Sequence, residues 1–173
     1  MDGGTHRWNG LIRHSAVLYC VVAFGAFAAA DSATAAPVGI SSNAFAIHQE
    51  EFFAVEPKRV FDALLDARQF SKMTGLPALI DPVVGGTFSL FNGVITGRTL
   101  EIVPNTLIVQ AWRDKVWPRG FFTIVRFELK AKGAGTLLIF DHTGLPQEAA
   151  EADSLALGWP EHYWKPLHDL VGG

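Results

Sequence analysis

The chain has 173 residues, a formal net charge of −3 and one cysteine, Cys20. This length suits a single ordinary domain, and one cysteine excludes a disulfide within the chain. A near-neutral charge without any Lys/Arg run disfavours binding to the phosphates of nucleic acid, so nucleic acid is not an expected partner.

The first 35 residues are predicted to be a secretory signal peptide. Arg7 and Arg13 make a weakly basic start, an apolar stretch covers residues 16–30, and Ala33-Thr34-Ala35 fits a small-x-small cleavage site. The apolar stretch is shorter than the roughly 18–20 residues of a membrane span. Cleavage would remove Cys20 and leave a chain beginning at Ala36, in which residues 36–44 are a linker.

This interpretation predicts an extracytoplasmic protein, in the periplasm or secreted, with no membrane association after cleavage. The mature chain would keep a net charge of −3, because two basic and two acidic residues are removed and 12 basic and 15 acidic ones remain. An uncleaved anchor is one alternative. A start codon placed too far upstream, which would make the protein cytoplasmic, is the other.

Residues 45–171 are predicted to form one domain that begins with a strand and two short helices. Residues 45–55 alternate loosely and indicate the strand. Pro57 is tolerated at the first position of a helix, and four apolar residues then share one helical face: Val60, Phe61, Leu64 and Leu65. A second helix is expected from Ala67 to about Met73, ending at Gly75.

Short apolar runs separated by Gly, Asn and Pro then predict an antiparallel meander. Strands are expected at residues 88–91, 94–103, 107–112, 121–130 and 136–143, with turns at Asn92-Gly93 and Pro104-Asn105. One face of the 121–130 strand carries Phe121, Thr123, Val125, Phe127 and Leu129, while Phe122, Ile124, Arg126, Glu128 and Lys130 make the other. This alternation is typical of a sheet with one covered and one wet face.

A long C-terminal helix completes the predicted fold. Its apolar stripe repeats at intervals of four, four and three residues, at Trp159, Tyr163, Leu167 and Leu170. Pro160 is expected to start this segment, with the part before it a separate turn or helix. Pro166 is expected to kink it by removing a backbone donor and freeing the His162 carbonyl. The order of elements predicts an α+β fold in which a curved antiparallel sheet wraps around the C-terminal helix.

The segment from Asp81 to Gly120 also resembles one known family. It contains Gly85-Gly86, the turn at Gly93, Trp112-Arg113 and Trp117-Pro118-x-Gly120. These motifs are similar to those of the domain related to the C-terminal half of the activator of heat-shock-protein-90 ATPase, in the START-like (SRPBCC) helix-grip superfamily. The resemblance covers residues 45–171, and it implies a helix-grip fold with a cavity between the sheet and the C-terminal helix.

A concave, mostly apolar cavity would suit a small hydrophobic molecule. The candidate ligand-binding residues are Arg98, Glu101, Trp112, Trp117, Phe122, His142, Trp159 and Tyr163. Each has an ordinary structural explanation as well: the aromatic residues as core, Arg98 and Glu101 as a solvated face, and His142 as a hydrogen-bonded strand residue.

Three functions are compatible with this sequence. The first is non-catalytic binding of a small hydrophobic molecule, without a cofactor. The second, implied by the resemblance, is a co-chaperone-like module that binds a protein and stimulates a chaperone ATPase. The third is a cavity enzyme of the cyclase or hydrolase type, with His142, Glu101 and Tyr163 as acid/base candidates.

Several catalytic patterns are absent from the sequence. Asp141 and His142 are neighbours on a predicted strand and point to opposite faces, so they are not expected to form a dyad. No HExxH, CxxC or carboxylate cluster occurs, so no metal site is expected. Gly85-Gly86 is not followed by the Lys-Ser/Thr of a phosphate loop and is interpreted as a turn or bulge.

Overall fold

The computed structural model describes residues 46–145 and 149–172, and of residues 149–153 the backbone alone. The predicted signal peptide and linker lie outside these residues. The elements are, in chain order, β1 (Ile47–Phe53), α1 (Pro57–Leu65), α2 (Ala67–Thr74), β2 (Leu79–Ile80), β3 (Thr87–Leu90), β4 (Ile95–Val103), β5 (Leu107–Asp114), β6 (Thr123–Lys132), β7 (Gly135–Thr143), α3 (Ala149–Trp159), the π-helical segment η1 (Pro160–Trp164) and α4 (Lys165–Val171).

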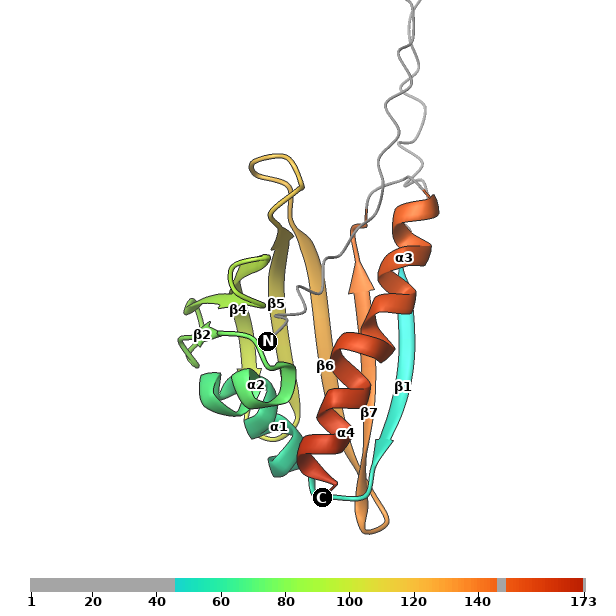
Figure 1. Cartoon of the computed structure of the whole chain (residues 1–173). Coiled ribbons are helices and arrows are strands. Elements are labelled where there is room, and N and C mark those ends of the chain that lie inside the picture. The colour runs from blue at the N-terminus through green and yellow to red at the C-terminus, as the bar shows by residue number, and fades with distance from the viewer. Residues whose placement is uncertain (1–45, 146–148, 173) are drawn as a thin grey trace, which may run out of the picture. The chain divides into compact units, whose positions relative to one another are not determined.

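The strands form a seven-stranded antiparallel sheet in the order β1-β7-β6-β5-β4-β3-β2. Figure 1 shows α1, α2 and the C-terminal helix on the same face of this sheet, which we call the inner face. The opposite, outer face carries no helix of the described residues. This is the predicted α+β helix-grip fold, and the antiparallel meander and the two short helices are confirmed.

Residues at the helix ends explain where α1 and α2 begin and end. α1 begins at Pro57, as predicted. The Asp66 side chain caps α2 by accepting hydrogen bonds from the backbone N–H groups of Arg68 and Gln69. Gly75 ends α2 with a left-handed φ of 70°. The short strand β2 was missed, because two residues carry no periodicity.

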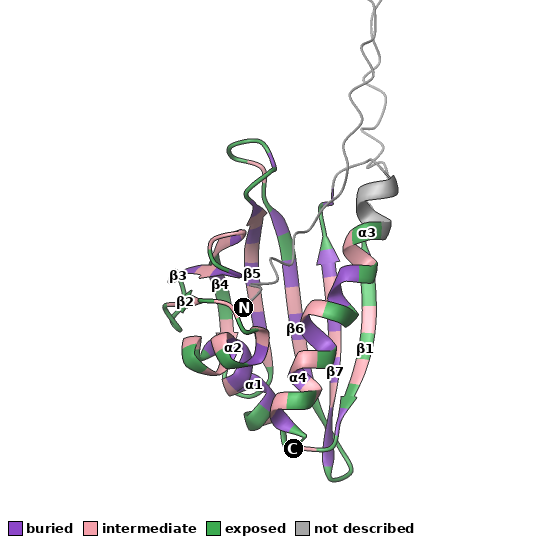
Figure 2. Cartoon of the chain, in the orientation of Figure 1, coloured by how far each residue is buried: buried purple, intermediate pink, exposed green. Residues whose placement is uncertain are grey.

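Alternation along the central strands determines which side chains enter the core. Figure 2 shows buried residues alternating with intermediate ones along β5 and β7, and with intermediate or exposed ones along β6. On β6, Thr123, Val125, Phe127 and Leu129 are buried, as the sequence predicted. At Gly97 a Cβ would lie 2.0 Å from the Ala111 carbonyl oxygen and 2.3 Å from the Phe88 ring, so a glycine is required there.

The C-terminal helix differs from the prediction. Pro160 does not start it: the helix is continuous from Ala149 to Val171, and Pro160 lies in its middle. The chain accommodates Pro160 and Pro166 by widening into a π-helical turn, in which Lys165 N–H donates to the Pro160 carbonyl five residues back. Gln49 of β1 donates to the Ala156 carbonyl, which an α-helix would have paired with the N–H that Pro160 lacks.

Among the described residues, no helix is both long and apolar enough to cross a membrane.

Candidate functional site

A row of side chains crosses the inner face beneath the C-terminal helix. Thr99 on β4 pairs with Gln110 on β5, Gln110 pairs with Val125 on β6, and Val125 pairs with His142 on β7. All four side chains are buried, and three of them are polar. We call Thr99, Gln110 and His142, together with Thr123, the buried polar row.

A chain of hydrogen bonds orders one part of this row. The Thr123 hydroxyl donates to the Trp112 carbonyl at 3.4 Å, and His142 Nε2 lies 2.7 Å from the same hydroxyl oxygen. The direction of the bond between His142 Nε2 and Thr123 depends on the imidazole tautomer. We assign the tautomer in which Nε2–H donates, because it leaves the Thr123 hydroxyl free to donate to the Trp112 carbonyl. Trp112 Nε1 in turn donates to Gln110 Oε1 at 2.9 Å.

Two buried polar atoms lack a partner. His142 Nδ1 and Thr99 Oγ1 have no hydrogen-bond partner among the described residues. Such orphaned atoms are rare in folded proteins, and each one calls for a physical explanation. The assigned tautomer leaves His142 Nδ1 with an unused lone pair, which could accept one hydrogen bond.

The site is electrically neutral. Burial lowers the pKa of His142 to about 3, so the imidazole is uncharged near neutral pH. Burial also raises the pKa of the Tyr163 hydroxyl well above its usual range, so it stays protonated. A neutral, largely apolar interior can bind an uncharged polar group and disfavours an ion.

Aromatic rings cover the row from the helix side. The Trp159 ring lies 4.2 Å from Phe140, 5.1 Å from Trp112 and 5.7 Å from His142, measured between ring centroids. Tyr163 lies 4.6 Å from Trp159 and 5.9 Å from Trp112. These rings fill the region between sheet and helix, so Trp159 would have to move before a molecule could reach His142.

The structure brings half of the predicted site residues together. Trp112, His142, Trp159 and Tyr163 are all buried in this cluster. The other four lie elsewhere: Trp117 is buried in the β5–β6 loop against Phe121, Phe122 is 50% exposed, and Arg98 and Glu101 are exposed. The alternation along residues 121–130 had already placed Phe122 on the polar face.

The polar members Thr99, Gln110 and Thr123 were missed as site residues. Thr123 could have been found, because it lies on the apolar face of its predicted strand. Thr99 and Gln110 depend on the register of β4 against β5, which shifts between Thr99 and Glu101 at an irregularity. No pattern in the sequence marks that shift.

The three acid/base candidates are not assembled. Glu101 pairs with Val109 and is exposed to solvent, whereas His142 and Tyr163 are buried under the helix. Asp141 and His142 face opposite sides of the sheet, as predicted: His142 is buried and Asp141 lies in a network on the outer face.

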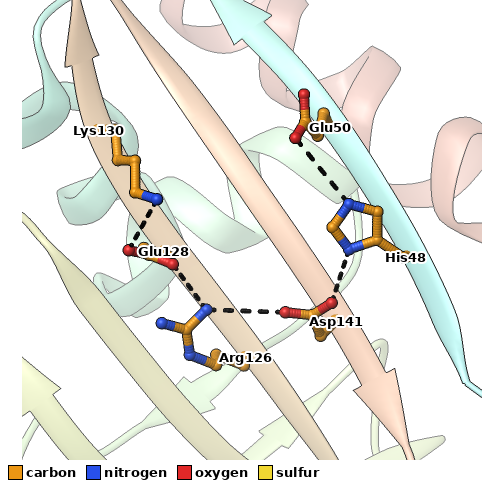
Figure 3. A network of polar contacts seen from close by, with 6 residues as sticks. All are labelled: His48, Glu50, Arg126, Glu128, Lys130 and Asp141. Atoms are coloured by element: carbon orange, nitrogen blue, oxygen red, sulfur yellow. Dashed lines mark hydrogen bonds and ion pairs between the residues drawn. The ribbon is translucent and has the colours of Figure 1, made fainter.

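That outer network, drawn in Figure 3, links β1, β7 and β6. His48 Nδ1 lies 2.7 Å from Asp141, Arg126 lies 3.7 Å from Asp141 and 2.8 Å from Glu128, and Lys130 lies 3.2 Å from Glu128. The hydrogen bonds from Arg126, and then from Lys130, lower the pKa of Glu128. Exposed pairs of this kind contribute about 0–1 kcal/mol each, so the network supports strand pairing.

No group of three or more His, Cys, Asp or Glu residues in the described part of the chain could hold a metal ion. The candidate site is the buried polar row, because it holds the two buried polar atoms without a partner among the described residues, and its chemistry is hydrogen bonding in an apolar interior.

Comparisons with known proteins agree with this architecture. The family model described as "Activator of Hsp90 ATPase homolog 1-like protein" matches residues 54–172. The human activator of 90 kDa heat shock protein ATPase homolog 1 is 28% identical over 138 residues, which cover 80% of this chain and 40% of that protein. A homolog from Dictyostelium discoideum is 27% identical over 111 residues, covering 64% of this chain and 28% of its own length. The chain thus spans less than half the length of these curated relatives.

Solved structures of other proteins share this fold. The crystal structure of an HSP90 activator from Plasmodium falciparum is 28% identical, with a TM-score of 0.69, over 73% of this chain and 96% of that one. CalU16 from Micromonospora echinospora is 21% identical, with a TM-score of 0.64, over 74% of this chain and 76% of its own, and shares the fold.

Proposed function

This chain belongs to the Activator of Hsp90 ATPase homolog 1-like family, and from its buried polar row we propose that it binds a small, mainly hydrophobic molecule between the sheet and the C-terminal helix. The observation that carries the proposal is the unpartnered Nδ1 of His142, in a side chain only 1% exposed. An unmade hydrogen bond of a buried group costs about 1–3 kcal/mol. A ligand that donates a hydrogen bond to Nδ1 would recover that free energy.

The tautomer defines the chemistry of the ligand. In the tautomer that we assign, Nε2–H donates to Thr123, so Nδ1 accepts and the ligand is a donor, such as a hydroxyl or an amide N–H. The neutral surroundings favour an uncharged molecule. Thr99 lies three strand spacings away, about 14 Å, so its free hydroxyl oxygen would contact only a longer ligand.

Binding requires an opening, which the geometry locates at Trp159. Its ring lies over both Phe140 and His142, and it is the last residue before the π-helical segment. Outward movement of α3 would expose His142 without separating the strands. The α4 end remains anchored by Leu167 and Val171, which are buried.

A pair of matched probes tests this function. We expect the full chain to bind naphthol about tenfold more tightly than methoxynaphthalene, measured by titration calorimetry, because only naphthol can donate a hydrogen bond. His142→Leu should bind the two probes equally. His48→Leu, on the outer face, should keep the preference. Absence of binding of either probe to the wild-type protein, or a preference that survives His142→Leu, would contradict the proposal.

A second function is favoured by the relatives, several of which are described as activators of the Hsp90 ATPase. On this view the domain binds a chaperone and stimulates ATP hydrolysis. Because the chain spans 40% of the human relative, this activity would require that one domain suffices. Stimulation of a purified Hsp90 ATPase by saturating full chain supports it, and His142→Leu should leave such stimulation unchanged.

We also propose that the protein acts outside the cytoplasm, on the strength of the signal-like residues 1–35. Mass spectrometry of the protein from its own host would give a chain beginning at Ala36. A full-length mass in the cytosolic fraction would overturn export and would favour the chaperone function.

A further inference from the structure

The connection between β5 and β6 is a second distinctive feature, and the proposed ligand site does not use it. It reads Lys115-Val116-Trp117-Pro118-Arg119-Gly120-Phe121-Phe122. In Figure 1 this loop extends beyond the ends of the two strands it joins. Figure 2 shows most of it exposed, although it is rich in aromatic residues.

Internal contacts hold the loop in one shape. Trp117 N–H donates to the Asp114 carbonyl, and Phe121 N–H donates to the Pro118 carbonyl, both at 3.1 Å. Arg113 Nη2 donates to the Trp117 carbonyl at 2.7 Å. The Trp117 ring is buried edge-on against Phe121, at 5.4 Å between centroids. The side chains that point outward are therefore presented on an ordered support.

Those outward side chains are apolar and cationic. Val116 is 68% exposed and Phe122 is 50% exposed. Lys115 and Arg119 are exposed as well, and neither forms an ion pair within the described part of the chain. The loop's neighbouring acid, Asp114, is buried and accepts a hydrogen bond from the Val116 N–H.

We propose that the β5–β6 loop docks the protein on a membrane surface that contains anionic lipids. Val116 and Phe122 enter the headgroup layer, and Lys115 and Arg119 contact the lipid phosphates. Apolar residues interleaved with basic ones are what interfacial binding requires. The negative charge of an anionic bilayer complements the two exposed cations of this loop, Lys115 and Arg119.

The shape of the loop favours a bilayer over a folded protein. The loop, residues 115–122, has far fewer residues than the roughly 20–30 per side of a standard protein interface. Lipid headgroups can rearrange around a projecting loop and so surround its exposed side chains. This proposal does not rest on the ligand site, and it departs from the expectation that the mature chain has no membrane association.

Vesicle co-sedimentation of the full chain tests it. Phosphatidylcholine vesicles with and without phosphatidylglycerol are compared for the wild type, for Lys115→Ala/Arg119→Ala and for Val116→Ser/Phe122→Ser. Each cation removed should weaken binding to the anionic vesicles about fivefold. The double variant Lys115→Ala/Arg119→Ala should lose both contributions. Removal of the two apolar side chains should weaken binding to both kinds of vesicle.

Matched controls lie away from the loop. Lys132→Ala at the end of β6 and Leu79→Ser on β2 change exposed residues of the same types, and they should bind like the wild type. Every variant keeps residues 1–45, so a difference between variants reports the loop. Equal binding by loop variants and controls would overturn the proposal. Loop variants that bind vesicles normally but lose capture of a protein would overturn it too, in favour of a protein surface.

Discussion

His142 occupies an interior position where an apolar side chain would leave no nitrogen unpaired. It is enclosed by Trp112, Phe140 and Trp159, and within the described part of the chain only its Nε2 has a hydrogen-bond partner. Keeping such a group costs free energy of folding. Residues retained at a cost to stability commonly serve binding or catalysis, and this is why His142 is central to the proposed function.

The titration of His142 gives a test of its burial. Its pKa is about 3 in the folded chain and 6.5 ordinarily, so between these values the unfolded chain takes up a proton that the folded chain refuses. Stability should therefore fall as the pH drops from 6.5 toward 3, by about 1.4 kcal/mol per pH unit from this group. His142→Gln should lose less stability than the wild type between about pH 8 and about pH 5, measured by urea unfolding.

His48→Gln is the control for this experiment, because it removes an exposed histidine from the outer face. Because His142 is intact in this variant, it should lose more stability on acidification than His142→Gln does. Equal acid sensitivity in His142→Gln and the wild type would mean that His142 is solvated in solution.

At the scale of elements, the C-terminal helix depends on one glutamine of the edge strand. Gln49 Nε2 donates to the Ala156 carbonyl at 2.9 Å, and Gln49 Oε1 accepts from Trp164 Nε1 at 2.6 Å. The first bond replaces the helical one that Pro160 cannot make. Gln49 thus joins β1 to the helix on both sides of Pro160.

A double-mutant cycle tests this compensation. Gln49→Leu leaves two half-buried groups unpaired and should lower the free energy of unfolding by about 2 kcal/mol. In a Pro160→Ala background the restored N–H can pair with Ala156, so the same change should cost about 1 kcal/mol less. Urea unfolding of the wild type, the two single variants and the double variant gives the coupling free energy between Gln49 and Pro160.

Gln69→Leu on α2 is the matched control, because its side-chain amide makes no hydrogen bond within the described residues. It should change stability by only a few tenths of a kcal/mol, as surface substitutions usually do. Strict additivity of Gln49→Leu and Pro160→Ala would show that the Ala156 carbonyl is satisfied in another way.

At the scale of the whole molecule, the C-terminal helix covers the hydrophobic core. Its buried residues Tyr163, Trp164 and Leu167 cover the inner face of β6 and β7, where Phe127 and Phe140 lie. Without the helix, this apolar face would meet water, and large exposed apolar patches cause aggregation.

Truncation tests this dependence. A chain that stops before Trp159 should be insoluble or aggregated, as judged by size-exclusion chromatography of the soluble fraction. Leu157→Ser, at an exposed position of the same helix, should remain soluble and monodisperse to the same degree as the wild type. A soluble, cooperatively folded truncate would contradict the helix-grip packing.

Much of this architecture was predictable from local patterns. The alternation at residues 121–130 gave the buried and exposed faces of β6 correctly, and Pro57 and Gly75 marked helix ends. Four of the predicted ligand-binding residues, Trp112, His142, Trp159 and Tyr163, lie together in the buried cluster around the row. Their role in binding remains a prediction.

The sequence by itself determined the order of the main strands and helices and the buried face of β6, because periodicity and turn residues act over a few neighbours. The tertiary structure alone decided which distant residues meet. His48 contacts Asp141 across 93 positions, Gln49 contacts Ala156 across 107, and Thr99 joins the row of His142 through the register of four strands. Strand register and helix packing depend on contacts between residues far apart in the sequence. No local pattern specifies those contacts.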